Sequence, residues 1–191
     1  YITDSLIEAV LARDVMALHT IHKPSLLRSA FLLATQLPAQ IMAYNKMLGQ
    51  LQDAGNTTTL AHYIQLLERA FLLSGLQLFR KGATRQRASS PKLVLWNNAL
   101  INAASLRPYD RARQDTAWWG RLVENAVGAH LLNHLSKLPY WIGYWRKGNH
   151  EVDFVVTTGQ TTWAIEVKSG RDKPAGGIAA FVTHYPKAQP I

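Results

Sequence analysis

Apolar residues recur at helical spacing through most of residues 1–70. A first apolar face consists of Leu6, Val10, Leu11, Val15 and Leu18. The stretch from Leu26 to Leu37 follows Pro24 and Ser25, which are typical of a helix start. The pattern therefore predicts a helical N-terminal region.

Residues 46–76 have the pattern of a helix-turn-helix. A short helix is predicted to end near Asp53, a turn follows at residues 54–56, and a long helix opens with the threonines at positions 57–59. Gly55 suits the turn, and a threonine suits the helix cap. The predicted apolar face of the long helix consists of Leu60, Ile64, Leu67 and Phe71.

Two strands are predicted at residues 76–79 and 92–96, with a basic connection between them in the place of the wing of a winged-helix protein. The connection has no acidic residue, and its basic residues are Arg80, Lys81, Arg85 and Arg87. It could contact nucleic-acid phosphates or form a solvated hairpin loop, and both interpretations stay open. The long helix offers only His62, Gln65 and Arg69 for groove contacts, so a packing role is favoured for it.

The pattern changes near Pro91. A short helix is predicted at residues 97–106, and a long helix capped by Asp115 is predicted up to residue 137. Its predicted inward residues are Leu122, Val123, Ala126 and Val127, with Glu124 and Asn125 beside them. Strands follow at 140–146, 151–157 and 162–168, and a helix at 176–185. We therefore expect an α+β fold with a helical, winged-helix-like part over residues 1–95 and an α/β part over residues 96–191.

Charged residues stand inside the apolar strands of "EVDFVVTTGQTTWAIEVKSG", residues 151–170. A two-residue turn at Gly159 and Gln160 suits glycine at its first position, and counting outward pairs Asp153 with Glu166. Opposed carboxylates repel unless a cation lies between them. The pairing therefore predicts a divalent metal at this point.

Strand alternation predicts a polar face and an apolar face for this hairpin. The polar face should carry Glu151, Asp153, Glu166 and Lys168, together with Val155 and Ala164, and the apolar face should carry Val152, Phe154, Ile165 and Val167. A solvated charged face is the simpler alternative. The charges gather at one end of the hairpin, which favours a structured site.

The chain has 21 Lys and Arg residues against 12 Asp and Glu, a formal net charge of +9 that favours polyanionic partners. The absence of cysteine excludes a disulfide scaffold and thiolate catalysis. No apolar run is long enough to cross a membrane and no signal peptide is evident, so we expect a cytoplasmic protein without membrane association. Because the chain begins at Tyr1 and ends in "YPKAQPI", we expect it to be a fragment of a longer protein.

"EVDF", "IEVK" and the helix "GRLVENAV" together resemble the core of the PD-(D/E)XK nucleases, although Val152 replaces the leading proline. The resemblance implies that Asp153, Glu166 and the backbone carbonyl of Val167 hold Mg²⁺ or Mn²⁺. It further implies that Lys168 orients or deprotonates the attacking water and that Glu124 reaches the metal or its water. The reaction would be hydrolysis of a phosphodiester.

The order of "LARDV", the helix-turn-helix, "SPKLVLWN", "GRLVENAV", "YWR", "EVDFVV", "IEVKSG" and "AFVTHYPKA" resembles the C-terminal region of bacterial and archaeal AAA-type P-loop ATPases. This resemblance implies a winged helix and a C-terminally truncated nuclease-like domain that follow an ATPase domain. ATP would bind to that missing N-terminal domain, because no Walker loop occurs here. Two hypotheses follow: a metal-dependent nuclease acting on nucleic acid, with DNA favoured, or an inert nuclease-like scaffold that binds DNA or regulates the ATPase.

Overall fold

The computed structural model describes residues 7, 9–11, 15, 21–51, 56–80, 90–105, 107–170 and 176–191. The helices are α1 (Pro24–Gln36), α2 (Tyr44–Gln50), α3 (Thr57–Arg69), α4 (Asn98–Ser105), α5 (Tyr109–Gln114), α6 (Thr116–Leu135) and α7 (Gly176–His184). The strands are β1 (Leu73–Leu78), β2 (Lys92–Leu95), β3 (Trp141–Lys147), β4 (His150–Thr157), β5 (Thr162–Ile165) and β6 (Gln189–Pro190). The fold is α+β, as the sequence predicts. No described helix is long and apolar enough to cross a membrane.

Within the described residues, the strands form one six-stranded sheet in the order β2-β1-β3-β4-β5-β6. The β1–β2, β3–β4 and β4–β5 pairs are antiparallel, whereas β1 runs parallel to β3 and β5 parallel to β6. The pairing of Gln77 with Gly143 joins β1 to β3, so the sheet continues across the boundary expected after residue 95. Lys81, Arg85 and Arg87 lie outside the described residues.

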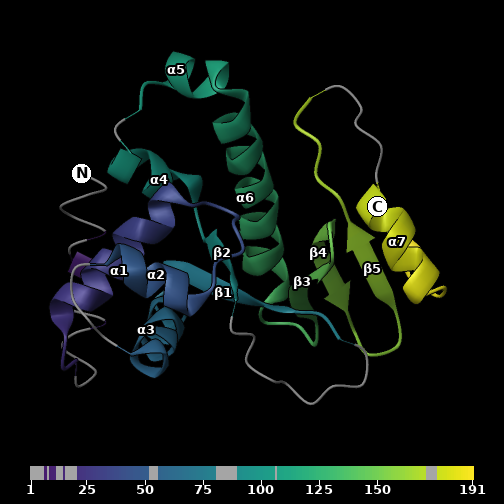
Figure 1. Ribbon diagram of the computed structural model, residues 1–191, viewed down its shortest axis with the longest axis horizontal. Helices are drawn as coiled ribbons and strands as arrows, with labels where there is room; N and C mark the ends of the chain where they lie inside the picture. The colour runs from purple at the N-terminus through teal and green to yellow at the C-terminus, as the bar shows by residue number, and fades with distance from the viewer. Residues whose placement is uncertain are drawn as a thin grey trace.

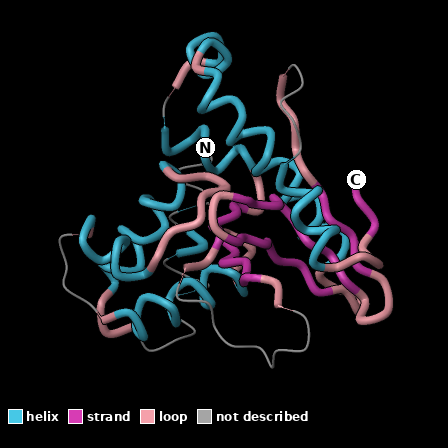
Figure 2. The backbone as a smooth tube through the Cα atoms, turned by 45° about the vertical axis from the view of Figure 1, so that its right-hand side comes forward, coloured by secondary structure: helices cyan, strands magenta, loops and turns pink. Residues whose placement is uncertain are grey.

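Two helices cover opposite faces of this sheet (Figure 1). On the α7 face, Phe181 packs with Trp145 and Val155. On the α6 face, Leu132 packs with Val94 and Phe154. In Figure 2 the magenta strands run between cyan helices, and the helices of the N-terminal part lie toward the other end of the molecule from the C-terminus. A sheet buried on both faces explains why charged side chains on its strands need internal partners.

The N-terminal helices share a large apolar core with β1, β2 and α6. Leu60, Ile64 and Leu67 of α3 are buried in it, as predicted. Phe71 was expected on the same face, but it lies beyond the end of α3 with a φ of 56° and is 57% exposed. The cap of α3 is Asn56 and not a threonine, since the Asn56 side chain accepts a hydrogen bond from the Thr59 N–H at 2.7 Å.

Helix α6 begins at the predicted cap, because Asp115 accepts a hydrogen bond from the Trp118 N–H. Its buried residues are Trp118, Leu122, Asn125, Gly128, Ala129 and Leu132. The prediction that Ala126 points inward is wrong, because Ala126 is exposed, and Val123 and Val127 are only half-buried. The buried stripe instead passes through the polar Asn125.

Gly128 allows α6 to approach the sheet closely. A Cβ atom at this position would lie 2.8 Å from ring carbons of Phe154 and 2.9 Å from Cγ1 of Val94. Real Cβ atoms do not come so near to a packed ring, so any larger residue would push the helix away or displace Phe154. The glycine thus helps to hold α6 against β2 and β4.

A bulge in β4 changes which side chains share a face. The register shifts between the pairs Gly143–Val155 and Trp145–Val152, so that Asp153 and Phe154 together oppose a single residue of β3. The predicted alternation is therefore wrong at this point, since Val152, Val155 and Ala164 pack together on the α7 face while Phe154 packs on the α6 face. Strand β5 also ends at Ile165 and not at residue 168.

Candidate metal centre

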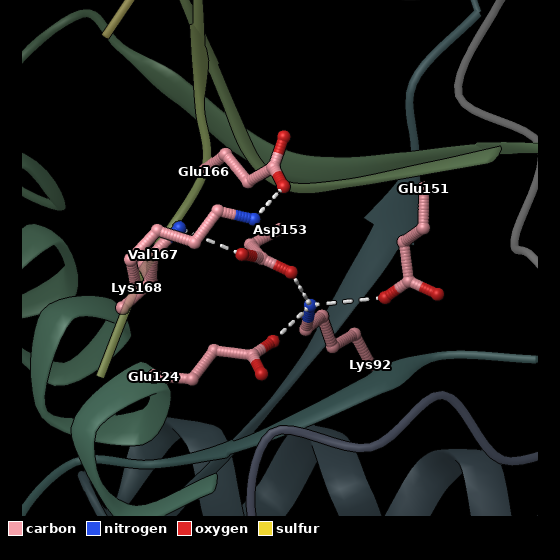
Figure 3. A network of polar contacts seen from close by, with 7 residues as sticks. All are labelled: Lys92, Glu124, Glu151, Asp153, Glu166, Val167 and Lys168. Carbon is pink, nitrogen blue, oxygen red and sulfur yellow. Dashed lines mark hydrogen bonds and ion pairs between the residues drawn. The ribbon is translucent and has the colours of Figure 1, made fainter. Parts of the chain in front are cut away.

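A buried lysine of β2 lies at the centre of three carboxylates. The Lys92 side chain has no solvent exposure, and its Nζ forms an ion pair with Glu124 of α6. The same Nζ lies 3.3 Å from Oε1 of Glu151 and 3.6 Å from Oδ1 of Asp153, both on β4 (Figure 3). It also lies 5.2 Å from the centroid of the Phe154 ring. We call Lys92, Glu124, Glu151 and Asp153 the acidic cluster.

The backbone and side-chain contacts of neighbouring residues hold the acidic cluster together. Asn125 accepts a hydrogen bond from the Leu95 N–H at 2.9 Å and donates to the Leu95 carbonyl at 3.0 Å. This pair of bonds ties α6 to β2, so Glu124 is placed beside Lys92. Because Lys92 and Val94 are two residues apart on β2, their side chains share the face that meets α6. The elements β2, α6 and β4 thus fix the positions of the four charged residues.

The charges of the acidic cluster influence one another strongly. Burial alone would lower the pKa of Lys92, but the nearby charges of Glu124, Asp153 and Glu151 raise that pKa above its ordinary value. Burial raises the pKa of Glu124 to about 7, although Lys92 acts in the opposite direction. The lysine is therefore the fixed positive charge of the site, and Glu124 can gain or lose a proton near neutral pH.

The hairpin register predicted from Gly159 is confirmed. Phe154 pairs with Ile165, and the Thr158 N–H donates to the Thr161 carbonyl at 3.1 Å across the turn. Gly159 has a φ of 92°, which favours glycine. The pairing ends one step before Asp153 and Glu166, because β5 ends at Ile165.

The predicted metal ligands beyond β5 take different positions. Oδ2 of Asp153 accepts a hydrogen bond from the Val167 N–H at 2.8 Å. Glu166 forms an ion pair with Lys168 and is not part of the acidic cluster (Figure 3). Oε2 of Glu166 is buried and has no hydrogen-bond partner among the described residues. Asp153 thus belongs to the acidic cluster and also contacts the backbone next to the Glu166–Lys168 pair.

The donor set suits a hard divalent cation. Carboxylate oxygens of Glu124, Glu151 and Asp153 lie within 4.8 Å of one another. Oxygen ligands of this kind fit Mg²⁺ and Mn²⁺. A bound ion would have to displace the Lys92 ammonium from at least one carboxylate, because Nζ contacts all three.

Sequence reasoning missed Lys92, and it placed Glu151 on the polar face without treating it as a ligand. Lys92 in the apolar strand "KLVLW" could have been recognised in the same way as Asp153 in "EVDFVV". In both cases a charged residue inside a buried strand indicates that an oppositely charged partner lies nearby. Among the predicted basic residues, Arg80 is exposed. The other three lie outside the described residues, so the structure leaves the nature of that connection open.

Residues 1–111 match a family model described as a domain of unknown function, DUF8612. The chain belongs to the DUF8612 family. Residues 119–190 of this DUF8612 chain also match a domain of unknown function, DUF4143, a domain found in AAA-ATPase-associated proteins. No curated protein and no solved structure matches the chain. The two matched segments meet near α5, and the acidic cluster draws Lys92 from the first and its three carboxylates from the second.

Proposed function

We propose that the acidic cluster is the centre of a metal-dependent phosphodiester hydrolase. The observation that carries this proposal is the convergence of Glu124, Glu151 and Asp153 within 4.8 Å, from a helix and a bulged strand. The resemblance of "EVDF", "IEVK" and "GRLVENAV" to PD-(D/E)XK nucleases supports it. The preferred substrate class is nucleic acid, with DNA favoured.

The residues of the site would have two roles, metal binding and orientation of the attacking water. Asp153, Glu124 and Glu151 would hold Mg²⁺ or Mn²⁺, and the resemblance adds Glu166 and the Val167 carbonyl. Such an ion supplies charge stabilisation at the scissile phosphate. Lys168, held by Glu166, orients the attacking water. As a ligand, Glu124 would contact the ion directly or through a water bound to it.

The protein that contains this chain is proposed to couple the site to an ATPase domain. The DUF4143 match supports this proposal, since that domain occurs in AAA-ATPase-associated proteins. ATP would bind to the ATPase domain and not to the acidic cluster. The winged-helix-like part, with its basic connection, would bring nucleic acid to the site.

A second candidate function is favoured by Lys92. Its ammonium already contacts all three carboxylates and balances part of their charge. A buried charge group of this kind can be purely structural. In that case the chain is an inert nuclease-like scaffold that binds DNA or regulates the ATPase.

A cleavage assay with matched variants separates the two functions. Plasmid and single-stranded DNA are incubated with the protein and Mn²⁺ or Mg²⁺, using Asp153→Asn as the test variant and Asp110→Asn, an exposed residue of α5, as the control. If the protein is a hydrolase, the wild type and the control should nick the plasmid, and Asp153→Asn should not. Equal absence of cleavage in all three proteins, with or without the ATPase domain, would favour the scaffold.

A further inference from the structure

A hollow lined by cations lies beside the acidic cluster. Its volume is about 450 Å³, and its basic lining residues are Lys46 of α2, Arg80 after β1 and Arg146 of β3. Tyr144 and Ser90 also line it, and none of the described residues that line it is acidic. The hollow is therefore positively charged, next to a group of negative charges.

Within the described residues, the three cations have no acidic partner. Lys46, Arg80 and Arg146 are exposed, and none of them forms an ion pair with a described residue. The Tyr144 hydroxyl donates to the Ser90 carbonyl at 2.5 Å, which joins β3 to the segment before β2 at this hollow. The basic side chains thus surround a part of the sheet in which β3 is hydrogen-bonded to the segment before β2.

Two pairings place the hollow directly against the acidic cluster. Arg146 is the cross-strand partner of Glu151 in the β3–β4 ladder, so their side chains share a face. Ile41, which also lines the hollow, forms a bridge with Lys92. A chain of phosphates lying in the hollow would therefore continue toward the carboxylates.

We infer that this hollow binds a phosphate of a nucleic-acid backbone and positions the neighbouring phosphate at the acidic cluster. Two guanidinium groups and one ammonium group match the oxygens of a phosphodiester, and guanidinium can bind it through two parallel hydrogen bonds. That the ligand is a nucleic acid rests on the proposed function. Free nucleotides and inorganic phosphate share the same chemistry, so the test includes both.

The test measures binding in EDTA, so that metal binding and cleavage do not enter. A short labelled DNA duplex and a labelled single strand are titrated with the wild type, with Lys46→Gln/Arg80→Gln/Arg146→Gln, and with Arg111→Gln/Arg113→Gln/Lys137→Gln. The control variant removes the same three charges from exposed positions outside the hollow. ATP and inorganic phosphate are added as competitors, and thermal melts confirm that each variant is folded.

The inference predicts that the hollow variant binds DNA about tenfold or more weakly than the control variant and loses about one unit of salt dependence per lost phosphate contact. Equal affinities and equal salt slopes for the two variants would overturn it. Binding of ATP or inorganic phosphate with no binding of DNA would also overturn it, in favour of a small phosphate ligand. If the triple variant is unfolded, Arg80→Gln alone must show a smaller loss in the same direction, and wild-type affinity in that variant would overturn the inference.

Discussion

The ammonium of Lys92 and the carboxylate of Glu124 form an ion pair between β2 and α6 with no solvent exposure of the lysine side chain. Because Glu151 and Asp153 face the same Nζ, Lys92 stands where a divalent ion would bind. A metal bound as proposed would therefore compete with the lysine for the same oxygens. Under the proposed function, metal binding would therefore require Lys92 to move away from at least one carboxylate.

Replacing Lys92 with Met tests this competition. Without metal, Lys92→Met leaves three neighbouring carboxylates without their cation, and loss of one partner of a buried ion pair costs about 3–5 kcal/mol. With Mn²⁺, the same variant should recover stability, because the ion replaces the missing charge. Thermal melts across a Mn²⁺ titration should show a larger rise in Tm for Lys92→Met than for the wild type. A smaller rise in the variant would mean that Lys92 does not compete with metal.

The pKa of Glu124 predicts how stability depends on pH. Its folded-state pKa of about 7 lies above the ordinary value of 4.5, so the folded protein retains a proton that the unfolded chain loses. The contribution of Glu124 to stability is thus full below pH 4.5, and it is lost as the pH rises through about 7. Denaturant unfolding at several pH values should show this loss in the wild type, at up to about 1.4 kcal/mol per pH unit, and not in Glu124→Gln. If the free energy of unfolding changes with pH in the same way in both proteins, the raised pKa of Glu124 would be contradicted.

Asn125 should be required to position the site. Asn125→Leu keeps the branching at Cγ and the number of heavy atoms but removes the hydrogen bonds to both the N–H and the carbonyl of Leu95. Each buried group left unpaired costs about 1–3 kcal/mol, so the free energy of unfolding should fall by several kcal/mol. Asn133→Leu, on the same helix but exposed, is a control whose side chain bonds to the Trp96 carbonyl. A fall no larger in Asn125→Leu than in the control would show that Asn125 does not hold α6 to β2.

Gly128 should tolerate no larger residue without a cost. Gly128→Ala places a Cβ atom 2.8 Å from the Phe154 ring, so α6 or Phe154 must move. Overpacking of this kind costs about 1–3 kcal/mol. Chemical denaturation measures this loss in the free energy of unfolding. Gly49→Ala, whose added Cβ meets nothing within 4 Å, is the matched control. Equal stability of the two variants would contradict the close approach of α6.

Sequence patterns predicted the elements well because their signals are local. The cap at Asp115 and the turn at Gly159 depend on residues next to one another in the chain, and both are confirmed. The hairpin count from Gly159 also gave the correct pairing of Phe154 with Ile165.

The features that the sequence missed depend on contacts between distant residues. The bulge at Asp153 and Phe154 forms against β3, and no local signal marks it. Lys92 meets its carboxylates only because β2 joins the same sheet as β3 and β4. The sequence predicts a divalent metal between Asp153 and Glu166. The structure instead places Lys92 against Glu124, Glu151 and Asp153, and Lys92 is 59 residues from Glu151 in the chain.

The most direct measurement is a crystal structure of the protein grown with Mn²⁺, with anomalous scattering used to locate the ion. The account predicts a manganese peak bound by Asp153, Glu124 and Glu151, with Lys92 Nζ turned away from at least one of them. Crystals of Asp153→Asn grown in the same way should show no peak. Wild-type crystals without manganese at this position, and with Lys92 still in contact with all three carboxylates, would contradict the metal-dependent account and leave the scaffold.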